Sequence, residues 1–108
     1  MTMLGTYNVG DQPSFTATFR NAAGALADPT VVKFITYPAG GTPTIYVYGT
    51  DPEVVRDSAG VFTFTHPQLG ATLAGKTVHI RANGSGAVTS SDEDTFRVKP
   101  TAFTTPLP

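Results

Sequence analysis

The chain has 108 residues, a formal net charge of −1 and no cysteine. Its length is that of a single domain. Seven Lys and Arg against eight Asp and Glu leave no basic face for phosphates, so we expect no nucleic-acid partner. The absence of cysteine excludes disulfides, zinc–thiolate sites and thiol catalysis.

The composition favours β-strands over helices. Thr, Val and Ile together supply 31 residues, whereas Leu, Met, Glu, Gln, Lys and Arg together supply only 18. Stiff β-branched side chains suit a pleated, half-buried surface, so the sequence predicts an all-β protein. No apolar run approaches the roughly 18–20 residues of a membrane span, and we expect no membrane partner.

The N-terminal half begins with a predicted edge strand over residues 4–9 and a turn over 10–13. Residues 14–20 then alternate, with Phe15, Ala17 and Phe19 on the buried face. After a turn over 21–24, residues 31–37 form a strand whose phase is ambiguous. We prefer the phase that buries residues 32 and 34, because the other buries the charge of Lys33. The alternative is a bulge that returns residues 35 and 37 to the interior.

The remaining strands are short and are separated by turn signals about every ten residues. Residues 38–43 are predicted to be a hairpin-type loop, from which residues 44–48 return as a strand. Residues 53–56 are a short strand or a turn, and residues 61–65 alternate with Phe62 and Phe64 buried. Residues 68–75 hold at most one helical turn, since they contain two glycines. Strands over 76–82 and 94–99 follow, with Asn83-Gly84-Ser85-Gly86 predicted as the hairpin turn near them.

These elements predict seven to eight short strands, and an immunoglobulin-like antiparallel β-sandwich over residues 1–100 is the economical arrangement. A closed barrel is the alternative. The last nine residues, 100–108, contain three prolines. Residues 101–108 are therefore predicted to be an extended C-terminal tail.

An ordered string of short motifs resembles the small immunoglobulin-like virion structural proteins of tailed bacteriophages. The string spans about residues 7–99, and its pieces are specific in their order and spacing rather than singly. Two features depart from that family: Val78 and Ile80 stand where a Trp is common, and the strand at Lys33-Phe34 is shifted by one residue. The motifs are Tyr7-x-x-Gly10-Asp11, Phe15-x-Ala17-x-Phe19, Asn21-Ala22-Ala23-Gly24-Ala25, Asp28-Pro29-Thr30-x-Val32, Pro38-Ala39-Gly40, Tyr46-x-Tyr48-Gly49-Thr50-Asp51, Val55-Arg56-Asp57-Ser58-Ala59-Gly60-Val61-Phe62, Gly84-Ser85-Gly86-Ala87-Val88 and Thr95-Phe96-Arg97-Val98.

The resemblance implies a non-enzymatic virion component that decorates the capsid as an accessory or minor capsid protein, or that sits at the neck or tail. Its expected partners are other virion proteins, first the major capsid protein, with a homo-oligomer on the particle also open. The N-terminus shows no secretory signal pattern, so we expect synthesis in the host cytoplasm and localisation in the virion.

Exposed apolar side chains are the candidate partner contacts. In residues 45–48 every side chain is large, and Ile45 and Val47 inward would leave Tyr46 and Tyr48 outward, where tyrosines favour interfaces. The alternative is that the second sheet or a loop covers the two tyrosines. In the tail, Phe103 and Leu107 lie on a proline-stiffened segment that suits a groove or sheet edge, and the alternative is a frayed chain end. Leu4 in the N-terminal arm is similar.

The sequence predicts no catalytic residue, no metal ligand and no cofactor. We expect His66 and His79 to be ordinary surface or turn residues, and the acidic run 92–94 to be a solvated loop, since calcium needs six to eight oxygens. The alternative function is a carbohydrate- or host-surface-binding module, which would use Tyr46 and Tyr48 as its aromatic platform. A saturable change in tyrosine fluorescence with glycan would identify it.

Overall fold

The computed structural model describes the backbone of residues 2–100 and the side chains of residues 5–100. This part of the chain forms eight strands and one short 3₁₀ turn, η1 (Ala71–Leu73), within the stretch expected to hold at most one helical turn. The strands are β1 (Thr2–Tyr7), β2 (Ser14–Thr18), β3 (Val31–Pro38), β4 (Thr44–Val47), β5 (Val54–Ser58), β6 (Val61–Thr65), β7 (Thr77–Ser85) and β8 (Ser90–Val98).

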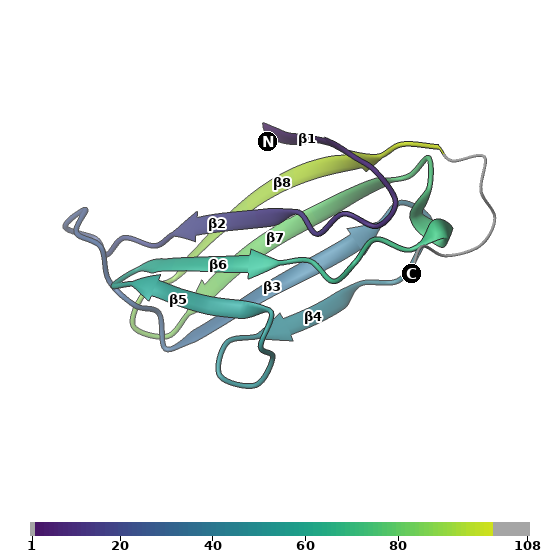
Figure 1. Ribbon diagram of the computed structural model, residues 1–108. Coiled ribbons are helices and arrows are strands. Elements are labelled where there is room, and N and C mark those ends of the chain that lie inside the picture. The colour runs from purple at the N-terminus through teal and green to yellow at the C-terminus, as the bar shows by residue number, and fades with distance from the viewer. Residues whose placement is uncertain (1, 101–108) are drawn as a thin grey trace.

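The strands form two sheets that pack face to face, which confirms the predicted β-sandwich (Figure 1). The larger sheet has the order β1-β8-β7-β3-β4, and the smaller has the order β2-β6-β5. In immunoglobulin terms the small sheet is B-E-D and the large one contains G-F-C, with β4 in the place of strand C′. The strand order is therefore immunoglobulin-like.

One strand pair departs from the expected antiparallel pattern. β1 pairs with β8 in parallel, with Gly5 beside Phe96 and Tyr7 beside Val98. β1 belongs to the large sheet and β2 to the small one, so the turn between them crosses the sandwich instead of closing a hairpin. A strand that changes sheets in this way is free to take the parallel direction.

The core lies between the sheets and consists mostly of residues that alternation placed inside, joined by Val54, Leu69 and Val88, which it did not. Phe34 and Phe64 stack from opposite sheets with ring centroids 5.6 Å apart. Burying one such side chain contributes about 1.5–3 kcal/mol, so the aromatic centre is the main apolar contribution to the fold. The buried hydrophobic residues are Phe15, Ala17, Phe19, Val32, Phe34, Val54, Phe62, Phe64, Leu69, Val78, Ile80, Ala82, Val88, Phe96 and Val98.

The ambiguous strand 31–37 adopts the preferred phase. Val32 and Phe34 are buried, whereas Lys33 and Ile35 lie on the other face and Tyr37 is 47% exposed. The register of β3 against β7 runs without a break from Val31 to Pro38, so the alternative bulge does not form.

The hairpin between β7 and β8 is longer than the sequence predicts. Asn83 and Gly84 do not form the turn but lie inside β7, where Gly84 pairs with Val32 on one side and Ser90 on the other. The turn falls at residues 86–89 instead, and β8 begins at Ser90 rather than at Asp94. The acidic run 92–94 is therefore part of a strand and not the solvated loop we expected.

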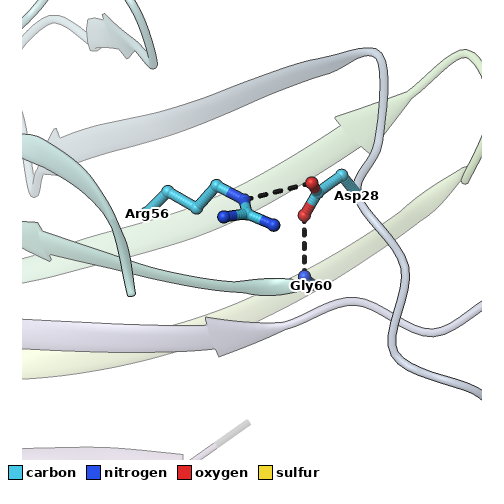
Figure 2. A network of polar contacts seen from close by, with 3 residues as sticks. All are labelled: Asp28, Arg56 and Gly60. Carbon is cyan, nitrogen blue, oxygen red and sulfur yellow. Dashed lines mark hydrogen bonds and ion pairs between the residues drawn. The ribbon is translucent and has the colours of Figure 1, made fainter. Parts of the chain in front are cut away.

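A carboxylate fastens the β2–β3 connection to the β5–β6 hairpin (Figure 2). Asp28 accepts a hydrogen bond of 2.7 Å from the Gly60 backbone N–H and one of 3.1 Å from Nε of Arg56. The hydrogen bond from the Gly60 N–H is the largest influence on the pKa of Asp28 and lowers it; desolvation opposes it, and the Arg56 charge adds a smaller lowering. This contact joins segments that are about thirty residues apart and fixes one end of the sandwich.

Candidate functional site

The outer face of the five-stranded sheet carries a patch of large side chains, formed by β3, β4, β7, β8 and the loop between β3 and β4. Because strand side chains alternate between faces, the residues between the buried ones point outward here. In β3 these are Ile35 and Tyr37, and in β7 they are His79 and Arg81. We call this surface the outer patch; it comprises Ile35, Tyr37, Pro43, Ile45, His79, Arg81 and Glu93.

The outer patch is hollowed. A shallow depression of about 360 Å³ is lined by Ile35, Tyr37, Pro43, His79, Arg81 and Glu93, together with Ile80, whose side chain is buried on the core side. The register explains the gathering, since Ile35 lies beside Arg81 and Tyr37 lies beside His79 across the β3–β7 ladder. The depression is large enough to receive side chains from a partner.

The apolar part of the outer patch is on β3 and β4. Ile35 lies directly opposite Ile45 across the ladder, and Ile45 is 54% exposed. The Tyr37 ring, 47% exposed, lies 6.5 Å from the His79 ring between centroids. Exposed isoleucine and tyrosine side chains that adjoin one another in this way are typical of a surface that another protein covers.

Charged side chains border the apolar part. Arg81 donates to Glu93 at 3.2 Å, since the β7–β8 register places the two opposite each other. Both side chains are about half exposed, so the pair contributes at most about 1 kcal/mol to stability. Lys33 and Arg97 also lie between buried neighbours and point outward, so this face carries more positive than negative charge.

β4 takes the phase opposite to the one we expected, so the predicted outward position of Tyr46 was wrong. Tyr46 points inward, with its ring 4.8 Å from Phe64, and Ile45 points outward. Burial, followed by the charges of Glu53 and Asp51, raises the pKa of Tyr46. The side chain expected to contact a partner therefore packs on the core.

Tyr48 is 43% exposed, but its ring also packs edge-on against Phe62 at 5.1 Å. Phe103 and Leu107 lie outside the described residues, as does the side chain of Leu4. The structure therefore brings none of the five predicted contact residues into the outer patch among the residues it describes.

Part of the outer patch could be predicted from the sequence. Once Val32 and Phe34 are placed inside, alternation puts Ile35 and Tyr37 outside, and the strand 76–82 puts His79 and Arg81 outside. The hairpin-type loop at 38–43 also predicted that the strand 44–48 returns beside 31–37, and the pairing of β4 with β3 confirms this. The phase of β4, which sets Ile45 on the outer face beside Ile35, has no local signal, because the side chains on both of its faces are large.

The two histidines differ in environment. His79 lies on the outer patch, as predicted, but His66 is only 9% exposed and packs between Phe64 and Phe96 at 5.9 and 5.7 Å. Burial lowers the pKa of His66, and its Nδ1 lies 2.7 Å from the Pro67 carbonyl oxygen. His66 is therefore a core histidine and not the surface or turn residue we expected.

Within residues 2–100, no group of three or more His, Cys, Asp or Glu side chains is arranged to hold a metal ion. None of the helices in this same stretch is long and apolar enough to span a membrane. A scan against protein-family models and a search of curated proteins found no match to this chain.

Proposed function

We propose that this protein is a non-enzymatic structural component of a tailed-bacteriophage virion, and that it docks on another virion protein through the outer patch. The ordered motifs over residues 7–99 support the virion assignment, because they resemble the immunoglobulin-like structural proteins of such particles. The exposed Ile45 and Tyr37, with the half-buried Ile35 next to both on the same face, carry the docking assignment. Capsid decoration is the preferred location, and attachment at the neck or tail is the second.

The energetics of the outer patch suit a repeated lattice contact. Fully burying an isoleucine or tyrosine contributes about 1.5–3 kcal/mol, and these side chains are already partly buried. A single docking event is therefore weak after the entropy cost of association. Many copies on a symmetric shell offset that weakness, since neighbouring contacts raise the effective concentration.

Quantitative mass spectrometry of purified particles tests the virion assignment. The chain is measured in virions of the phage that encodes it, with the major shell protein as the internal standard. A copy number close to that of the shell protein supports decoration, and a small fraction of it supports the neck or tail. Absence from particles that are otherwise complete would overturn the proposal.

A matched pair of variants tests the docking surface. Ile45→Lys and Val55→Lys change residues of nearly equal exposure, 54% and 52%, on the outer faces of opposite sheets. We expect Ile45→Lys to reduce incorporation into particles and Val55→Lys to leave it unchanged. Equal incorporation of both variants at equal stability would place the contact elsewhere.

The carbohydrate-binding alternative has lost the platform on which it depended. It required Tyr46 and Tyr48 side by side at the surface, and Tyr46 packs on Phe64 instead. In the outer patch, Tyr37 and His79 are tilted by 43°, which is not the flat row of rings that a sugar stacks on. Protein docking is therefore the better-supported function.

A further inference from the structure

One edge of β2 carries backbone groups that pair with no strand in the described part of the chain. In the ladder with β6, Phe19 N–H donates to Gly60 and His66 N–H donates to Pro13. Hydrogen-bonded pairs alternate along an antiparallel ladder, so residues 15 and 17 also face β6. The N–H and C=O groups of Ser14, Thr16 and Thr18 therefore point away from β6, and β2 pairs with no other described strand.

The other sheet edges are protected. At the free edge of β4, the Asp51 carboxylate accepts from the Val47 N–H at 2.8 Å, and the Asp51 N–H donates to the Val47 carbonyl. At the free edge of β5, the Val54 N–H donates to the Asp51 carbonyl, and the register breaks between Arg56 and Ser58. The register of β1 is also broken by a bulge. Blocked groups and bulges of this kind prevent edge-to-edge association.

β2 has none of these devices. Its five residues, Ser14 to Thr18, contain no charge and no proline, and their register against β6 is unbroken. The immunoglobulin sheet order A-B-E-D has a further strand beside strand B, and here β1 has joined the large sheet instead. The place beside β2 is therefore one that the fold accommodates and that no described strand occupies.

We propose that two copies of this chain associate by antiparallel pairing of their β2 strands, with Thr16 on the two-fold axis. In this register Thr16 pairs with Thr16 and Ser14 pairs with Thr18, so the three free residues of each strand give about six hydrogen bonds. Phe15 then lies beside the partner's Ala17, which sets a large side chain next to a small one. Since β2 is uncharged, the symmetric pairing meets no like-charge repulsion along the strand.

The pairing has a consequence for the arrangement of the dimer. The two small sheets become one continuous six-stranded sheet in the order β5-β6-β2-β2-β6-β5. A two-fold axis through an antiparallel pair runs perpendicular to the sheet, so both five-stranded sheets lie on the same side. The two outer patches then face the same way. The dimer does not depend on the proposed function, because it uses the opposite sheet.

Single-cysteine variants test both the edge and its register in a chain that has no native cysteine. Residues that form a hydrogen-bonded antiparallel pair have Cα atoms about 5.5 Å apart, within the range of about 4.4–6.8 Å for a disulfide. Thr16→Cys therefore forms disulfide dimers under copper-catalysed oxidation. Thr18→Cys does not, because its two copies are about 13 Å apart along the strands.

We expect Thr16→Cys to cross-link about tenfold faster than Thr18→Cys, and Ser14→Cys mixed with Thr18→Cys to give mixed dimers. Equal rates for Thr16→Cys and Thr18→Cys would overturn the register, and a lack of cross-linking in all of them would overturn the dimer.

Sedimentation of the unmodified full chain gives an independent measurement. We expect its mean mass to rise from monomer toward dimer with concentration. Thr16→Lys abolishes this rise, because it places two like charges on the axis. Thr63→Lys is the matched control, because it removes the same 3.0 Å contact between the Thr16 and Thr63 hydroxyl groups. Thr63 lies on β6, the central strand of the small sheet, so we expect this variant to dimerise as the unmodified chain does. A chain that stays monomeric at every concentration contradicts the proposal.

Discussion

Phe19 packs so closely on the backbone of Gly84 that a Cβ atom added at Gly84 would lie 2.9 Å from Cε1 of the ring. The two residues come from opposite sheets, β2 leading into Phe19 and β7 containing Gly84. Gly84 is therefore needed for the approach of the two layers, although its local sequence, Asn-Gly-Ser-Gly, is typical of a turn.

Gly84→Ala is expected to destabilise the protein by about 1–3 kcal/mol, since the added methyl group overlaps both Phe19 and the Pro29 ring at 2.7 Å. Urea unfolding followed by tyrosine fluorescence measures the loss. Gly70→Ala is the control, because its nearest contact would be 3.8 Å and its φ of −83° suits any residue. A Gly84→Ala protein as stable as Gly70→Ala would show that the sheets are farther apart than described.

Adjacent substitutions in β4 test the inward position of Tyr46. Tyr46→Ala removes a ring that contacts Phe64 and should cost about 2 kcal/mol, whereas Ile45→Ala should cost less than about 0.5 kcal/mol, as exposed sites do. Thermal melts of the two proteins at equal concentration measure the difference. If Ile45→Ala lost more stability than Tyr46→Ala, Ile45 and not Tyr46 would be the inward side chain of β4, as the sequence suggested.

Acidification is expected to destabilise the protein through His66. Burial lowers the pKa of His66 below its ordinary value of 6.5, so the folded state binds the proton less well than the unfolded chain. The stability that the uncharged His66 contributes is fully present above pH 6.5, and it is lost as the pH falls from 6.5 toward the folded-state pKa. Unfolding free energies between pH 8 and pH 5 measure this slope.

His66→Phe should remove the pH dependence of the unfolding free energy just below pH 6.5. The substitution removes the titrating group, and the site between Phe64 and Phe96 accepts an uncharged ring. His79→Gln changes the histidine of the outer patch, leaves the His66 site intact and should keep the part of the slope that comes from His66. If His66→Phe and the unmodified protein lose stability in parallel over this range, the titrating group is another one.

Asp28 tests the connection shown in Figure 2. Asp28→Ala removes the acceptor for the Gly60 N–H and should lower the melting temperature, whereas Asp28→Asn keeps an acceptor oxygen and should lower it less. Arg56→Gln should have the smallest effect, because the ion pair is exposed at both ends. If Arg56→Gln lowered the melting temperature as much as Asp28→Ala, the ion pair with Arg56 would be the main stabilising contact of Asp28, and not the hydrogen bond from the Gly60 N–H.

Asp28 also links stability to pH in acid. Because its pKa is lowered in the folded state, its contribution is present above the ordinary value of 3.8 and is lost as the pH falls through the folded-state pKa. Comparing the acid unfolding of Asp28→Asn with that of the unmodified protein measures this contribution. Coincident acid transitions would argue against it.

The all-β class and most of the core were determined by the sequence alone. Alternation with period two is a local property, so Phe15, Phe19 and Phe62 could be placed inside before any strand was paired. The preferred phase of β3 followed from the cost of burying Lys33. Turn chemistry located the ends of most strands, because glycine and proline restrict or release φ at the residue itself.

The tertiary structure decided what the local pattern leaves open. In β4 both faces are large and apolar, and only the position of Phe64 across the sandwich draws Tyr46 inward and leaves Ile45 outside. At Asn83-Gly84, long pairing with β3 and β8 and contact with Phe19 outweigh a strong local turn preference. The outer patch and the open edge of β2 exist only because strands distant in sequence pair, and those pairings gain their free energy from contacts that no single segment makes.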